Sequence, residues 1–94
     1  MTADALGADS VPRLGRGVRL KDDAARGGWV LLAPERVLVL DDTAHAVLQR
    51  LDGKRTVRDI ADSLAAEYDA PGGAILRDSL ALLRDLAAKG LVKT

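Results

Sequence analysis

Short apolar stretches in the first half of the chain predict three strands. Residues 18–21 alternate apolar with charged positions, which is the pattern of a half-buried edge strand. Residues 29–33 and 37–40 are continuous apolar runs separated by Pro34-Glu35-Arg36, and this spacing predicts a hairpin with a tight turn. We therefore expect a small antiparallel sheet. Because residues 37–40 are all apolar, both faces of the last strand should be shielded from water, and only one face can pack on the helices.

The second half of the chain has the apolar period of three helices. The first has N-cap candidates at residues 41–43 and stops at Asp52-Gly53. The second opens on the capping-box spacing of Thr56 and Asp59 and ends near residue 69. The third spans about residues 72–89, where Gly72-Gly73 is a helix start and lacks the lysine and preceding strand of a phosphate loop.

This order of elements predicts an α+β domain that is winged helix-turn-helix-like: a small three-stranded antiparallel sheet followed by a three-helix bundle. Residues 1–14 are mostly small and polar and show no sustained period. We expect them to form a flexible N-terminal tail, with residues 15–94 as a single domain.

Composition argues against chemistry carried by this chain alone. The chain has 94 residues, and 32 of its 45 apolar residues are alanine or leucine, so its core is small. It has no cysteine, and its single histidine with scattered carboxylates offers no metal-ligand spacing. His45 lacks a nucleophile and an orienting partner in the sequence, so it reads as a surface histidine rather than a general base. We expect no enzyme activity, no metal and no cofactor.

Charge and hydropathy limit the classes of partner that the chain can bind. The 14 basic residues are balanced by 14 acidic ones, without the basic excess that phosphate binding requires. The outward face of the third helix, with Asp78, Asp85 and several alanines, is unsuited to reading bases, which disfavours a winged-helix DNA regulator. No apolar run is long enough to span a bilayer and the start does not resemble a signal peptide, so we expect a cytoplasmic protein without nucleic-acid or membrane partners.

Two features suggest a binding surface. The third helix has an apolar arc of roughly 180°, wider than the roughly 100° that a helix packed on its own domain needs, so a flank with Leu76, Leu80 and Ala87 reaches the core edge or beyond. This flank is either extra burial or one wall of a groove. The strand at residues 36–40, if it is an edge, could pair with an extended peptide, pair with a second copy in a homodimer, or be buried. The residues alone leave these alternatives open.

Several motifs together resemble one bacterial family. They are Gly17-Val18-Arg19-Leu20, the run from Trp29 to Arg36 that contains Leu32-Ala33-Pro34-Glu35, Asp52-Gly53 with Thr56-Val57 and Ile60, and Asp78 with Leu82-Leu83 and Leu86. Over about residues 12–92 the chain resembles the PqqD family, the peptide chaperones of pyrroloquinoline quinone (PQQ) biosynthesis. Two departures are Ser79, where the family usually has valine, and Leu82, where phenylalanine is common.

The resemblance implies a RiPP recognition element, a domain that binds the leader of a ribosomally made and then modified peptide. It implies that the precursor PqqA adds as a strand and is presented to the radical-SAM enzyme PqqE. Two sets of residues carry over: Arg36, Val37, Leu38, Val39 and Leu40 for backbone pairing, and Leu76, Ser79, Leu80, Leu83 and Arg84 for the groove wall. The alternative within this class is a leader-binding element of another RiPP pathway.

Overall fold

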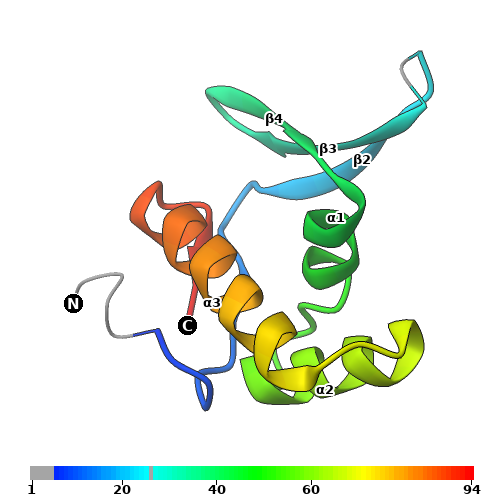
Figure 1. Cartoon of the computed structure of the whole chain (residues 1–94). Helices are drawn as coiled ribbons and strands as arrows, with labels where there is room; N and C mark the ends of the chain where they lie inside the picture. Colours follow the sequence, from blue (N-terminus) through cyan, green and yellow to red (C-terminus); the bar gives the residue numbers. More distant parts are fainter. Residues whose placement is uncertain (1–5, 26) are drawn as a thin grey trace.

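The computed structural model describes residues 6–25 and 27–94, and its main sheet contains the predicted hairpin. Strands β2 (Arg19–Asp23), β3 (Gly28–Ala33) and β4 (Arg36–Leu40) form an antiparallel sheet in the order β2-β3-β4. Figure 1 shows this sheet lying across one side of the helices. The predicted α+β architecture is confirmed, although each of the three strands is one residue longer than the sequence pattern suggested.

Three helices follow, and the first two begin at the cap signals that predicted them. They are α1 (Asp42–Leu48), α2 (Val57–Tyr68) and α3 (Gly72–Ala88). The Asp41 carboxylate accepts the Ala44 N–H at 2.7 Å and caps α1. At α2 the capping box is complete, because the Thr56 hydroxyl accepts the Asp59 N–H while the Asp59 carboxylate accepts the Thr56 N–H. None of the helices in the described part of the chain is long and apolar enough to cross a membrane.

The turn between α1 and α2 is held by one carboxylate. The backbone N–H groups of Arg55 and Lys54 donate to Asp52 at 2.9 Å each, and these hydrogen bonds lower the pKa of Asp52. Gly53 follows with a positive φ of 74°, a conformation that glycine adopts without steric cost. The Asp52-Gly53 pair therefore directs the chain into the cap of α2, whereas α1 already ends at Leu48, earlier than the stop at Asp52-Gly53 that the sequence predicted.

The core lies between the helices and one face of the sheet. Leu20, Leu31 and Leu38 are cross-strand neighbours on this inner face, and Leu31 is only 1% exposed. They pack with buried residues from all three helices, among them Val47, Leu48, Val57, Ile60, Leu64, Leu83 and Leu86. Most of the leucines in the sequence belong to this cluster or pack against it.

The N-terminal segment differs from the expected flexible tail. Residues 1–5 lie outside the described residues, but residues 6–14 belong to the domain. Leu6 is 3% exposed within the core, and its carbonyl accepts the Arg84 Nε–H at 2.8 Å. The carbonyls of Ala8 and Ser10 accept the Arg58 and Val57 N–H groups, which satisfies backbone donors in the first turn of α2. Such contacts leave no periodic pattern in a sequence.

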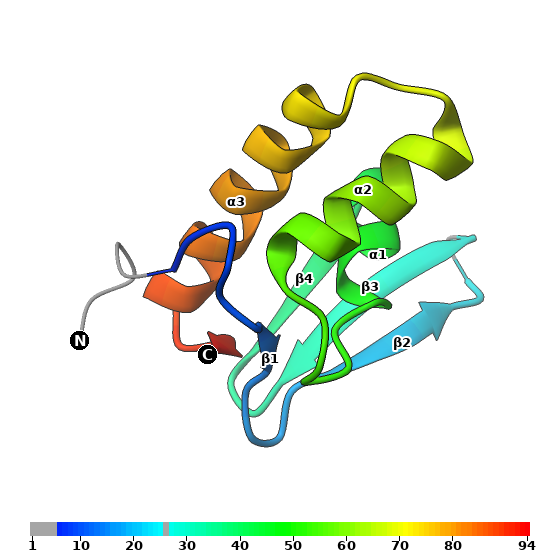
Figure 2. The same ribbon diagram turned by 90° about the horizontal axis from the view of Figure 1, so that it is seen from below.

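A second, two-stranded sheet joins the two halves of the chain. Strand β1 (Arg13–Leu14) pairs antiparallel with β5 (Val92–Lys93), as Figure 2 shows near the C-terminus. Beside this pair, Gly15 donates its N–H to the Leu91 carbonyl at 2.8 Å, and a Cβ at Gly15 would come within 3.0 Å of the Gly90 carbonyl oxygen. This close backbone approach accounts for glycine at this position.

The outer face of the main sheet is exposed to solvent. Val37 and Val39 of β4 point to this face, and their exposed fractions are 60% and 68%. The expectation that both faces of the last strand are shielded is therefore not met within this chain.

Candidate functional site

Strand β4 is an edge strand whose outward backbone groups can be assigned from the register. Pro34 and Glu35 form a two-residue loop, so the flanking pair Ala33 and Arg36 is hydrogen-bonded. Hydrogen-bonded and non-hydrogen-bonded pairs alternate along an antiparallel ladder. Leu38 and Leu40 therefore bond to β3, whereas Val37 and Val39 direct their N–H and C=O groups away from it. No strand of the described residues pairs with this edge.

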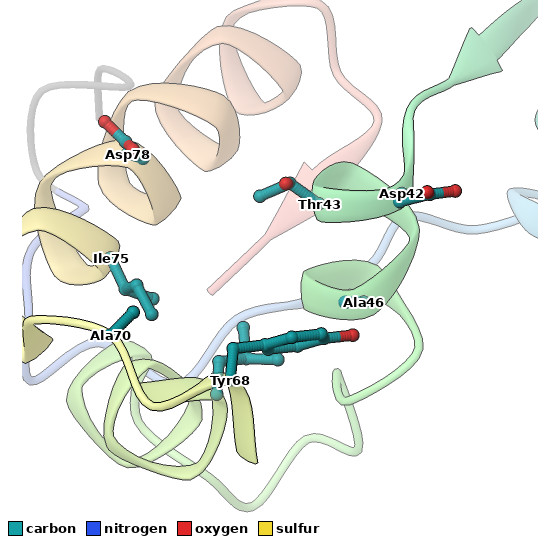
Figure 3. Close-up of a pocket in the computed structure, with 8 residues that line it drawn as sticks. Asp42, Thr43, Ala46, Tyr68, Ala70, Ile75 and Asp78 are labelled. Atoms are coloured by element: carbon teal, nitrogen blue, oxygen red, sulfur yellow. The ribbon is translucent and has the colours of Figure 1, made fainter. Parts of the chain in front are cut away.

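A pocket opens just beyond the C-terminal end of β4. It has a volume of about 260 Å³ and lies between the start of α1, the end of α2 and the first half of α3. In Figure 3, Thr43 projects from α1 toward α3, and the Tyr68 ring lies across the pocket below Ala46. The lining is mostly apolar, with two carboxylates: Asp42, Thr43, Ala46, Leu64, Tyr68, Ala70, Ile75 and Asp78.

The size and chemistry of this pocket suit a side chain better than a whole substrate. Pockets that enclose a small-molecule ligand usually exceed about 300 Å³. The apolar floor formed by Leu64, Ala70 and Ile75 favours an aliphatic or aromatic group. Tyr68, with 60% of its surface exposed, is available for such a contact. The pocket was not predicted from the sequence, because its residues come from three helices and share no motif.

One side of α3 faces this pocket. Ile75 and Asp78 line it, and at 100° per residue Leu82 lies within about 20° of Ile75 on the helix. Arg84 lies about 180° from Ile75, where its side chain bonds to the carbonyl of Leu6. The helix therefore has two distinct flanks, one toward the pocket and one covered by the N-terminal segment.

The predicted groove-wall residues of α3 are not together on the open flank. Ser79 and Leu83 are 2% and 0% exposed, so they belong to the core. Leu76 and Leu80 are half-buried and pack against that core, and Leu80 lies one turn from Arg84, on the side of the N-terminal segment. The apolar arc was correctly read as wide, but an arc does not reveal which of its flanks faces the sheet. By contrast, Arg36, Val37, Leu38, Val39 and Leu40 do form one edge strand, as predicted.

Ser79 places a polar side chain in the core. Its hydroxyl has no hydrogen-bond partner in the described part of the chain, although the atom is buried. An unpaired buried hydroxyl destabilises a fold. The position is one of the two at which the sequence departs from the family pattern noted above.

The domain combines an open strand edge, a three-helix bundle and a side-chain-sized pocket at the end of that edge. This is the architecture of a RiPP recognition element. Residues 28–92 match the family described as coenzyme PQQ synthesis protein D (PqqD), and the chain belongs to this family.

Relatives and solved structures agree with this membership. The chain is 53% identical over 83 residues to the "PqqA binding protein" of Bradyrhizobium diazoefficiens, covering 88% of this chain and 81% of the relative. The solution structure of the PqqD truncation of Methylobacterium extorquens PqqCD, described as a stand-alone RiPP recognition element, superposes with a TM-score of 0.88 at 47% identity over all of both chains. A lasso peptide synthetase B1 complexed with its leader peptide matches at a TM-score of 0.75 and 28% identity, covering 90% of this chain and all of that one.

Proposed function

We propose that this protein binds the precursor peptide PqqA by strand addition to β4 and presents it to the radical-SAM enzyme PqqE in the bacterial cytoplasm. The observation that carries the proposal is the edge of β4, where Val37 and Val39 offer unpaired backbone donors and acceptors. The names of the relatives and the leader-bound lasso synthetase support the same kind of ligand.

The register also predicts how the peptide is read. Side chains of an added strand alternate between the two faces of the sheet. Peptide residues opposite Leu38 and Leu40 would point inward, toward α3 and α1, and a residue just beyond Leu40 would reach the pocket lined by Thr43 and Ile75. On α3 we propose the flank with Ile75, Asp78 and Leu82 as the wall. This replaces Leu76, Ser79, Leu80, Leu83 and Arg84 as the expected wall.

The contribution of such a domain is positional and not catalytic. Holding a flexible precursor beside its enzyme raises the local concentration of the reacting segment, to roughly millimolar for a short tether. We expect the gain in PqqE cross-linking to saturate at about one domain per PqqA.

The β4 edge can be tested by removing one outward donor. Proline is tolerated on an edge strand where the N–H faces solvent, so Val39→Pro should fold yet lose the bond to the peptide. Asp22→Pro is the matched control, because the same alternation directs the Asp22 N–H away from β3 at the opposite edge of the sheet. We expect Val39→Pro to weaken PqqA binding at least 10-fold in calorimetric titration and Asp22→Pro to leave it unchanged.

An amide NMR titration is the second test of peptide binding at β4. Shifts on adding PqqA should cluster on residues 36–43 and on the Ile75, Asp78 and Leu82 flank of α3. Unchanged affinity in Val39→Pro, or shifts confined to β2, would contradict strand addition at β4.

A further inference from the structure

The outer face of the main sheet carries an ordered pattern of charge and apolar surface. The register aligns two parallel rows across the three strands, each with a basic residue on β2 and apolar residues on β3 and β4: Arg19, Leu32 and Val37, and Lys21, Val30 and Val39. Five of these six side chains, all except Arg19, border a shallow hollow of about 360 Å³, together with Asp22 and Asp23.

The apolar side chains on this outer face are not part of the core of the domain. Val39 is the most exposed large apolar side chain among the described residues, at 68%, and Val37 follows at 60%, the same as Tyr68. Single exposed valines are ordinary, but these two are neighbours on one face, beside the half-buried Leu32 and the buried Val30 of β3. A contiguous apolar patch on a small domain marks an interaction site.

Strand addition does not cover this surface. A peptide paired with β4 lies beside the strand, about 5 Å away in the plane of the sheet, so Val37 and Val39 remain on the face. Peptide residues opposite these valines would point to the same face and lengthen both rows by one position. The loaded domain would thus present a surface made partly of its own side chains and partly of the peptide.

We propose that this outer face is the docking surface for the peptide-modifying enzyme, and that the bound peptide completes it. The proposal rests on the proposed function above. The expected partner surface is apolar and bordered by carboxylates, because Arg19 and Lys21 form no ion pair with any described residue and lie at the β2 end of both rows. A second copy of this chain would present the same two cations and would place like charges near one another unless they were offset.

A shared surface couples the two binding events. If the enzyme touches both the domain and its peptide, it binds the loaded domain more tightly than the empty one. By linkage, the enzyme must then tighten peptide binding by the same factor. The enzyme would thereby discriminate a loaded domain from an empty one without recognising the rest of the peptide.

The charged end of the rows is tested by Arg19→Glu/Lys21→Glu. Both residues lie two strands from the edge of β4, about 10 Å away, so PqqA affinity should change less than twofold. We expect PqqE affinity for the PqqA-loaded domain, measured by biolayer interferometry, to fall at least 10-fold. The matched control is Lys54→Glu/Arg77→Glu, which reverses two exposed charges away from the sheet and should leave both affinities unchanged.

The apolar end is tested by Leu32→Thr, which changes an outer-face residue of the central strand β3 and leaves the β4 edge as it is. PqqE binding should again weaken while PqqA binding persists, and wild-type PqqE affinity should be at least 10-fold higher with PqqA than without it. Normal PqqE binding by both Arg19→Glu/Lys21→Glu and Leu32→Thr would overturn the docking surface, as would self-association of the domain that Leu32→Thr abolishes in sedimentation. Equal PqqE affinity for loaded and empty wild type would overturn the composite surface. A wild-type domain that does not bind PqqA would instead contradict the proposed function.

Discussion

The rings of Trp29 and His45 are stacked, with centroids 4.1 Å apart and planes within 12° of parallel. Trp29 lies on the inner face of β3 beside Leu40, and His45 lies on α1. His45, predicted to be a surface histidine, is half-buried and joins the first helix to the sheet. The contact holds α1, whose Thr43 and Ala46 line the pocket, in place below β4.

Removing this stack should weaken the fold. Aromatic pairs contribute about 1 kcal/mol beyond their buried area, so we expect His45→Ala to lower the free energy of unfolding by about that much. His45→Phe is the control, because it keeps a stacked ring without the imidazole nitrogens. Urea unfolding followed by circular dichroism measures both variants. An equal loss in the two would show that the stack itself contributes nothing.

The two flanks of α3 predict different effects on peptide binding. Leu80 and Leu82 are both half-buried leucines, but only Leu82 is on the side of Ile75. Losing an apolar contact of this size costs about 1–2 kcal/mol, so Leu82→Ala should weaken PqqA binding by roughly 5- to 30-fold, while Leu80→Ala should change it less than twofold.

Thermal unfolding of these two alanine variants is the control for packing, since both leucines also touch the core. A larger loss of affinity in Leu80→Ala than in Leu82→Ala, at similar stability, would restore the wall that the sequence suggested.

Replacing Ser79 with an apolar residue should stabilise the protein. Ser79→Ala removes the unpaired hydroxyl and improves helix propensity, which together should raise the free energy of unfolding by about 1–2 kcal/mol. For a domain of this size that corresponds to a rise in Tm of about 4–16 °C. Ser79→Val tests whether the space also accepts the larger side chain usual in the family. A lower Tm for Ser79→Ala would mean that the hydroxyl has a partner.

Local signals were enough to predict most elements. The spacing of Thr56 and Asp59 marked the start of α2, and Pro34 marked the hairpin, because caps and turns are decided by residues close in sequence. The same hairpin predicted the strand at residues 36–40, but the residues alone left open whether that strand is an edge. These predictions concern interactions within a few residues, which is why they agree with the structure.

What the sequence did not predict depends on contacts between distant residues. Strands β1 and β5 have two residues each, too few to show alternation, and Leu6 is core only because α3 returns to cover it. The open flank of α3 is selected by which helix side the N-terminal segment occupies. The pocket needs three helices to be placed before it exists.

The pairing of the first and last strands has a consequence for synthesis on the ribosome. Leu6 receives the Arg84 side chain, 78 residues later in the chain, and Arg13 pairs with Lys93. Residues 6–14 are synthesised before all of these partners, so the segment cannot complete its contacts until both α3 and β5 have been made. We therefore expect the hairpin and α1 to form early, and the contacts of Leu6 and Arg13 to form late in folding on the ribosome.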